Sequence, residues 1–545
     1  MELGNSYHRS VQSILYLLLL GSLVLLLATK GITHEEIVSL QGDMPRYLMN
    51  GVYFYDLLKD LPLTHAMAYT YQYYARYPAL SLGHHPLLLS VAEVPFYTVL
   101  GVSVFSARWA IVFFMLGAVI AWFFLIKTLY DEKIALFSSA LFATTPFIVG
   151  FSRVVLSEIP TLALILVTAY FFYRFVQTDK SKYAYAFAIS FSLSVYAKHL
   201  AIFMLPIFLL YLLLTRGVRK LLAKEVILAV ILTFLLLLPL IPLTLKFSQT
   251  NISWVAQKSL SSRVGLSPIL YYPRALWQEQ LTLPVLILSL VSLGGSLYRR
   301  DKRAILFLLW IGIFYVEITC TGAREARYSI YWIPAFCLFA ATSVHLFPYR
   351  SWKILLSSLL IFTVAYQTYL AFLSQPEYAE GYESAAQYVT ENRKGESILF
   401  SADIDSGYFV FFTRKHDPYR DLIVLRADKM LVTSRMDYIV EERITRRDQI
   451  YEILRNFGVG YVVMEDKPFK SSPLEWLREE VKTDKFVLRK RIPISSNRST
   501  LQGVTLAIYE YKDYVPPVRG RILTMNIPLM GDSIKIQFDD LFHPP

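Results

Sequence analysis

Long apolar runs recur along the first 373 residues of the chain. The clearest runs are 14–28, 108–127, 134–150, 159–176, 225–245, 281–298, 304–320, 329–347 and 354–373. Each is close to the ~17–25 residues that an α-helix needs to cross about 30 Å of hydrocarbon. The pattern therefore predicts a mainly α protein whose first domain, residues 1–373, is a polytopic bundle of transmembrane helices.

Three segments need an interpretation of their own. Run 183–214 is too long for one straight span, and Lys198 and His199 interrupt it, which predicts two short helices joined there. Segment 86–101 is short and contains an acid and a proline, which favours a re-entrant or interfacial helix. No small-residue cleavage site follows run 14–28, so an uncleaved first span is favoured over a signal peptide.

Basic clusters between the apolar runs set the expected orientation. They lie at 216–220, 299–303 and 349–353, as in cytoplasmic loops under the positive-inside rule. Counting outward from them predicts about eleven to twelve spans with the N-terminus inside. This count places outside the membrane the loops 30–85, 151–158, 246–280 and 321–328 and the region after residue 373.

The chemistry changes after residue 373, where charged residues become frequent and the apolar runs shorten. Short apolar segments at 397–402, 422–427, 460–465 and 505–511 read as strands, and amphipathic segments at 381–395 and 447–458 read as helices. We therefore predict an extracytoplasmic α/β domain over 374–545, ending in a polar C-terminal tail.

Composition narrows the possible functions. The chain is 55% hydrophobic and 18% charged, whereas soluble domains are about a quarter charged. The net charge of +12 sits in short interhelical clusters and forms no basic stripe, which argues against nucleic acid as a partner. Two cysteines in apolar segments exclude a disulfide framework. With no glycine-rich nucleotide-phosphate loop, an activated substrate is expected to arrive on a membrane lipid.

The predicted external loops carry charged residues near the hydrocarbon edge, where an ionised group is costly unless it is paired or functional. Such a set suits a lipid-linked anionic substrate, because cations can clamp a phosphate while a carboxylate accepts a proton from an attacking hydroxyl. The candidates are Asp43, Arg46, Arg76, His84, His85, Arg153, Glu158, Lys198, His199, Arg324, Glu325, Arg327 and Tyr328.

Structural interpretations compete with these assignments. Asp43 can be an ordinary helix-capping residue, and Glu158 a first-turn acid ahead of a proline. The His84–His85 pair can form a turn before a helix, and Lys198–His199 is more simply a turn. Arg324 and Arg327 can be interface anchors whose charges reach the headgroups.

Four segments resemble one enzyme family. GDMPRYLMNG (42–51) places an acid shortly after the first span, and GHHPLLL begins a segment running to Arg108. A second acid follows in 144–164, and RYSIYWIP (327–334) opens a late span. In this order and spacing the chain resembles the polytopic C-type-fold glycosyltransferases, the group that contains protein O-mannosyltransferases and bacterial aminoarabinose–lipid A transferase.

The resemblance implies a sugar donor on a polyprenyl or dolichyl phosphate and inverting transfer to a hydroxyl of a protein, lipid or envelope glycan. It implies an active site at the extracytoplasmic face of the membrane. We interpret this membrane as the plasma (inner) membrane. Asp43 matches the general base and Glu158 the second acid, while Arg327 and Tyr328 match the late pair assigned to the donor phosphate. We expect the phosphate to be held also by His85, Arg46, Arg153 and Arg324. Met44 stands where the protein mannosyltransferases have a further acid, and Leu87 replaces the second proline.

Two further possibilities remain at this point. His84, His85, Asp43 and Glu158 are plausible ligands for a divalent metal ion, although their spacing is not that of a metal motif. A transporter or flippase for a lipid-linked substrate is the competing function, but its polar residues would lie near the bilayer midplane in two related halves. Here the charges gather in loops and no halves look alike, so the glycosyltransferase is preferred.

Overall fold

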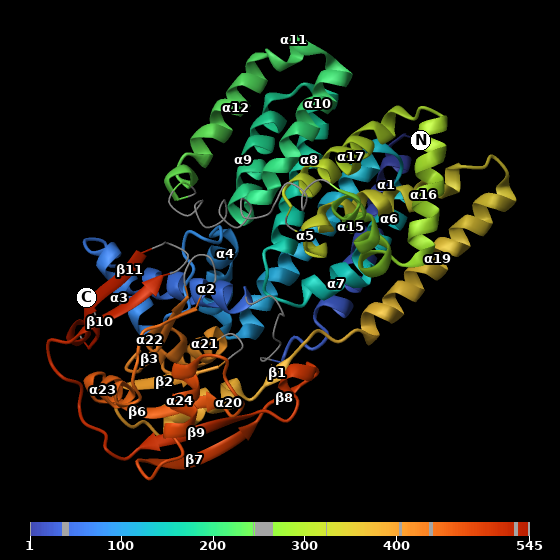
Figure 1. Cartoon of the computed structure of the whole chain (residues 1–545). Helices are drawn as coiled ribbons and strands as arrows, with labels where there is room; N and C mark the ends of the chain where they lie inside the picture. Colours follow the sequence, from blue (N-terminus) through green and yellow to red (C-terminus); the bar gives the residue numbers. More distant parts are fainter. Residues whose placement is uncertain are drawn as a thin grey trace. The chain divides into compact units, whose positions relative to one another are not determined.

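The computed structural model describes residues 2–34, 43–243, 245, 265–322, 324–402, 406–434, 440–527 and 532–542 (Figure 1). Contacts divide the chain into two compact units. The helical unit comprises 1–33, 108–243 and 255–375, and the mixed unit comprises 34–107, 244–254 and 376–545. The predicted boundary at 373/374 stays a prediction, while the contacts group 34–107 with the C-terminal region.

Six helical segments are long and apolar enough to cross a membrane among the described residues. They are Val11–Ala28 within α1 (Glu2–Ala28), α5 (Val104–Leu129), α8 (Glu158–Thr178), His199–Arg216, Lys302–Cys320 and α19 (Arg350–Leu373). A bent pair, α6 (Glu132–Thr144) and α7 (Pro146–Ser152), adds a seventh, with 63° between its helices. The bend follows from Pro146, which has no backbone N–H to continue the ladder of α6.

The predicted class of a mainly helical, multi-pass membrane protein is confirmed. The described residues contain six or seven candidate spans, where the sequence predicted about eleven to twelve spans for the chain. Several other apolar runs form helices of 17 residues or fewer. These are α9 (Ser181–Ala197), α12 (Lys224–Leu237), α16 (Leu283–Tyr298) and α18 (Ile333–Thr342). The first part of the predicted loop 246–280 lies outside the described residues, which resume at 265 with α15 (Leu266–Ala275).

The predicted break in 183–214 is confirmed. Helix α9 ends at Ala197, and a 3₁₀ turn (His199–Phe203) leads into α10 (Met204–Arg216). Lys198 therefore lies at the junction with an extended backbone. The other short elements of the helical unit are α11 (Val218–Leu221), η2 (Leu276–Gln280), η3 (Lys302–Ala304), α17 (Ile305–Cys320), η4 (Ala326–Trp332) and η5 (Ser343–His345).

A five-stranded sheet forms the centre of the mixed unit, in the order β3-β2-β6-β9-β7. Strand β2 (Ser397–Ser401) pairs in parallel with β3 (Ile423–Arg426) and β6 (Val459–Glu465), whereas β9 (Thr505–Tyr511) is antiparallel to β6 and to β7 (Phe486–Pro493). Every residue of β2 and β6 is buried, as expected for strands covered on both faces. The four predicted strands and the predicted α/β character are confirmed.

Both predicted helices of this region are present as α20 (Tyr382–Glu391) and α23 (Asp448–Asn456). The sequence analysis missed β7, whose middle residues are exposed and give no apolar pattern. It also missed a hairpin in the supposed polar tail, β10 (Ile522–Ile527) with β11 (Asp532–Gln537). The remaining elements are β1 (Ala379–Glu380), α21 (Gly407–His416), α22 (Ala427–Met430), β4 (Val432–Ser434), β5 (Val440–Glu442), α24 (Ser472–Glu480), β8 (Ser495–Ser496), η6 (Ser499–Leu501) and η8 (Phe538–Leu541).

Helices α2 (Met44–Asp60) and α3 (Ala66–Arg76) of the first predicted loop also belong to the mixed unit, as does α4 (Leu88–Leu100) of the segment 86–101. A buried ion pair joins α2 to α21. Arg414 donates from Nε to Asp56 Oδ2 at 2.9 Å and from Nη2 to Oδ1 at 2.6 Å. Tyr73 of α3 donates to the same carboxylate at 2.6 Å. One carboxylate thus connects α2, α3 and the C-terminal region.

Replacing Asp56 with Asn leaves the buried Arg414 cation without its counter-charge, and we expect the mixed unit to lose about 3–5 kcal/mol of stability. Asp60→Asn on the same helix is the matched control, because the Asp60–Arg420 pair is partly exposed and is expected to contribute less than about 1 kcal/mol. Thermal unfolding in lipid nanodiscs, with hydrogen exchange of α2 and α21, measures both. Equal stability of the two variants would contradict the assignment.

Candidate functional site

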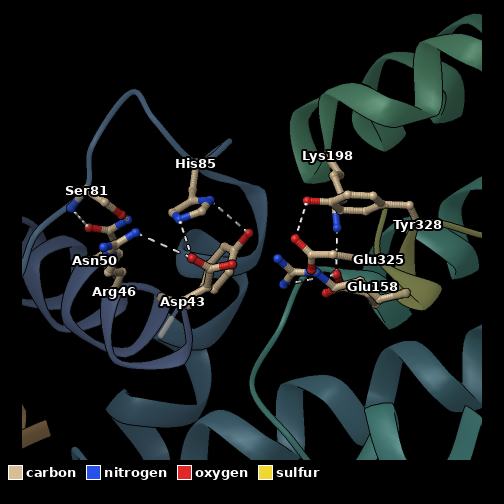
Figure 2. A network of polar contacts seen from close by, with 11 residues as sticks. Asp43, Arg46, Asn50, Ser81, His85, Glu158, Lys198, Glu325 and Tyr328 are labelled. Atoms are coloured by element: carbon tan, nitrogen blue, oxygen red, sulfur yellow. Dashed lines mark hydrogen bonds and ion pairs between the residues drawn. The ribbon is translucent and has the colours of Figure 1, made fainter. Parts of the chain in front are cut away.

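Asp43 precedes α2 as its N-cap residue, with Pro45 in the first turn, yet its side chain caps no backbone amide. Instead, Asp43 Oδ1 lies 3.4 Å from His85 Nε2 and 3.5 Å from Arg46 Nη1 (Figure 2). The Asp43 side chain is 17% exposed, so the carboxylate is largely covered but still reachable. Simple helix capping therefore does not account for this acid.

The loop before α4 is tied to α2, and this places His85. Asn50 of α2 accepts from the Ser81 backbone N–H at 3.0 Å and donates to Ser81 Oγ at 3.2 Å. The Tyr47 ring lies 4.9 Å from the His85 ring, and its hydroxyl lies 3.5 Å from Nδ1. Side chains one turn apart on α2 thus fix both the loop and the imidazole.

Glycine at position 51 lets α4 pack closely on α2. A Cβ there would lie 2.0 Å from Glu93 Oε2 and 2.9 Å from the Tyr97 ring. Both Glu93 and Tyr97 are buried, so their side chains cannot easily move away from an added Cβ. The close approach fixes the helix that follows the histidine loop.

A second cluster lies in the helical unit around Glu158, the first residue of α8, which is 1% exposed (Figure 2). Lys198 Nζ donates to Glu158 Oε1 at 2.6 Å, and Arg327 Nη1 lies 3.7 Å from the same oxygen. Arg327 Nε lies 2.6 Å from Glu325 Oε2, and the Tyr328 hydroxyl donates to Glu325 Oε1 at 3.1 Å. Residues from three segments distant in sequence therefore form one network.

The charges of this Glu158 cluster balance, with two carboxylates facing two cations. Both cations also lie over the Tyr328 ring, Lys198 at 5.2 Å and Arg327 at 5.4 Å from its centroid. Burial raises the pKa of Tyr328, and the Arg327 charge only partly opposes this, so the phenol stays protonated and can donate. A phosphate oxygen can enter such a cluster by exchanging with a carboxylate as the partner of Arg327 or Lys198.

Gln280 holds the 3₁₀ segment η4 that carries Arg327 and Tyr328. Its amide donates to the Ala326 carbonyl and to Ser329 Oγ, both at 2.7 Å, and accepts from Trp332 Nε1 at 2.8 Å. Gln280 ends the π-helical turn η2, which directly follows α15 with its internal proline. One buried amide therefore supports the backbone of η4 from its start to its end.

The other predicted site residues lie as follows. Arg153 is buried and donates to the backbone carbonyls of Leu27, Ala371 and Ser374 at 2.8–3.0 Å, which gives it a structural role at the ends of α1 and α19. Arg324 is partly exposed in the segment before Glu325. The His84 ring packs edge-on against the His85 ring at 4.7 Å. The predicted meeting of Asp43 with the Glu158 cluster stays a prediction.

Sequence reasoning gave three residues of these networks no role in the site: Lys198, Glu325 and Gln280. Lys198 was interpreted as a turn residue, although an isolated lysine within an apolar run needs a counter-charge. Glu325 was noted among the loop charges but received no role. No pattern distinguished Gln280 from other glutamines, because its three partners lie far along the chain.

The described residues contain no group of three or more His, Cys, Asp or Glu side chains arranged to hold a metal ion. The suggested set of His84, His85, Asp43 and Glu158 therefore finds no support as one ligand cluster in this part of the chain.

Comparison with known proteins finds a family match for part of the chain and a fold match for most of it. Residues 84–242 match the model of the family described as dolichyl-phosphate-mannose-protein mannosyltransferase. No curated protein matches the chain by sequence. ArnT from Cupriavidus metallidurans in the apo state superposes with a TM-score of 0.63 at 12% identity, over 94% of this chain and 100% of that one. The chain has an ArnT-like fold.

Two further structures support this ArnT-like assignment. ArnT from the same organism bound to undecaprenyl phosphate gives a TM-score of 0.61 at 13% identity, covering 92% of this chain and 98% of that one. The oligosaccharyltransferase AglB from Archaeoglobus fulgidus, in complex with an inhibitory peptide and a dolichol-phosphate, gives 0.54 at 13% identity, covering 84% and 70%. The predicted resemblance and fold class are confirmed, and the family match supports the predicted enzyme class, a membrane glycosyltransferase.

Gln280→Leu in this ArnT-like chain removes three buried hydrogen bonds while keeping a similar volume, so we expect η4 to be destabilised by about 1–3 kcal/mol. Hydrogen exchange of residues 324–332 measures the effect. Gln387→Leu is the control, because that exposed glutamine bonds only to Glu391 one turn away. Unchanged protection of η4 in Gln280→Leu would contradict the role of this amide.

Proposed function

We propose that this protein is a membrane glycosyltransferase that moves a sugar from a polyprenyl or dolichyl phosphate to a hydroxyl acceptor at the extracytoplasmic face. The ArnT-like fold and the family match of residues 84–242 support the reaction class. The observation that carries the proposal is Asp43, an N-cap acid that leaves its helix uncapped and faces a histidine and an arginine instead.

Asp43 acts as the general base. It accepts the acceptor's hydroxyl proton as that oxygen bonds to the anomeric carbon of the donor. The bond from the anomeric carbon to the phosphate oxygen breaks on the opposite side, and inversion follows. Arg46 and His85 hold the carboxylate in place for this transfer, as their distances of 3.5 and 3.4 Å indicate.

The leaving lipid phosphate gains negative charge as its bond to the sugar breaks. Arg327, Lys198 and Tyr328 are the donors that receive it, because cations that meet developing charge stabilise the transition state more than the ground state. Glu158, the second acid, contacts both Lys198 and Arg327 and so presents them together. Arg324 and, beside the base, Arg46 add positive charge, and the imidazole of His85 can donate a hydrogen bond. We leave Arg153 out because backbone carbonyls occupy its guanidinium.

Asp43→Asn keeps the shape of the side chain but cannot accept the proton. We expect transfer from a polyprenyl-phosphate sugar, assayed in proteoliposomes, to fall roughly 10²- to 10⁴-fold while binding of polyprenyl phosphate is retained. Asp179→Asn, whose carboxylate is half exposed beside Lys220, is the control and keeps full activity. A transporter would still move the lipid-linked sugar across the membrane in Asp43→Asn vesicles. If such movement is seen and the wild type transfers no sugar to an acceptor, the protein is not a glycosyltransferase.

Arg327→Lys preserves the charge but loses the planar fork that bridges Glu158, Glu325 and an incoming phosphate. We expect the KM for the lipid-linked donor to rise about ten-fold, with a smaller change in the KM for the acceptor. Arg303→Lys, at an exposed pair with Asp301, is the control. An unchanged donor KM in Arg327→Lys would remove this arginine from the phosphate site.

A further inference from the structure

A cavity of about 110 Å³ opens in the mixed unit beside α3. Its walls come from α3, from the turn that follows α21 and from the C-terminal segment after β11. The lining residues that matter here are Gln72, Arg76, Tyr419, Arg420 and Asp540. One water molecule needs about 10–15 Å³ of such space, so the cavity is large enough for several waters or for one edge of a small polar ring.

Two lining residues of α3 carry polar groups without a hydrogen-bond partner among the described residues. Gln72 Oε1 is buried and accepts no hydrogen bond from a described residue. Arg76 forms no hydrogen bond or ion pair with any residue in the described ranges, and burial lowers its pKa. A buried acceptor and a partly desolvated guanidinium are costly to leave unsatisfied, which points to a ligand that supplies both donors and acceptors.

The remaining charges of the lining are largely compensated. Arg420 pairs with Asp60 and also donates to the Tyr69 hydroxyl at 3.2 Å, while Asp421 pairs with Arg393 at 3.0 Å. Arg76 has no hydrogen-bonded counter-ion among the described residues, although Asp417 and Asp421 favour its charge from a distance, and Asp540 is exposed. The cavity therefore suits a neutral, hydroxyl-rich ligand better than a strongly charged one.

A fixed turn presents an aromatic ring at the rim. Tyr419 is 85% exposed, and it lies between Pro418 and Arg420, whose φ of 60° is in the left-handed region. The turn is held in place, because Asp417 accepts from the Leu422 N–H at 2.7 Å and Arg414 donates to the Asp417 carbonyl at 3.3 Å. Left-handed conformations of residues other than glycine persist where the surroundings enforce them, often at binding sites.

We propose that this α3 cavity binds one pyranose ring of a glycan, with the ring on Tyr419 and its hydroxyls at Arg76, Gln72 and Asp540. An amphipathic sugar ring matches an exposed aromatic face beside a small polar recess. The role of the cavity as an acceptor subsite rests on the proposed function, but sugar binding itself does not. No residue of the Asp43 or Glu158 clusters lines it.

Saturation-transfer NMR on the full-length protein in lipid nanodiscs tests the site, with millimolar methyl α-mannopyranoside and methyl β-glucopyranoside as probes. We expect saturation of ring protons in the wild type and a weakening of binding by about three- to ten-fold in Tyr419→Ala. Arg76→Met, which keeps the apolar stem, should weaken binding similarly. Tyr298→Ala is the matched control, because that tyrosine is 90% exposed in the helical unit.

The outcomes separate the two proposals. Absence of saturation transfer to both pyranosides, or a full signal in Tyr419→Ala, overturns the sugar site. Binding that persists in Asp43→Asn supports a site independent of the base. If the wild type binds the pyranosides but transfers no sugar, the proposed function fails and the sugar site stands. If both hold, Tyr419→Ala raises the KM for a pyranoside acceptor and leaves kcat unchanged.

Discussion

The Asp56–Arg414 ion pair is the constraint on which the mixed unit depends. Both side chains are almost completely buried, and the guanidinium meets the carboxylate through two hydrogen bonds. Neither charge tolerates burial without the other, because the desolvation cost of a lone buried ion is several kcal/mol. Since Asp56 lies in α2 and Arg414 in α21, helices far apart in sequence have to fold together. The helix that begins beside the proposed base is thereby oriented by the C-terminal region.

Helix α2 illustrates how one short element combines several functions. Its N-terminal end presents Asp43, its middle accepts α4 at Gly51, and its last turns hold Asp56 and Asp60 for two arginines. The Glu158 cluster differs in its charge balance. Its two carboxylates and two cations neutralise each other in the absence of a ligand. A phosphate that enters this cluster therefore displaces a carboxylate from Lys198 or Arg327, and that carboxylate then needs another partner or a proton.

Local patterns predicted much of this fold, and long-range partners explain what they missed. Strands β2, β6 and β9 and the break at Lys198 follow from runs of apolar residues and their interruptions. The described residues contain fewer full-length apolar helices than the predicted number of spans, because hydropathy does not reveal that α12 has 14 residues and α18 has 10. For the site, the candidate list included Glu158 and Arg327, which do meet. Their bridge to Lys198, the Gln280 support and the structural use of Arg153 depend on tertiary contacts that no spacing encodes.

The grouping of residues 34–107 with the C-terminal region has a consequence for protein engineering. One can build a chimera by exchanging the extramembrane portion between two relatives. The simplest design joins the two proteins at a single point after the last span. In this architecture such a graft separates Asp56 from its guanidinium and leaves α3 without the turn that follows α21. The transplantable module is therefore discontinuous, and both of its segments have to travel together.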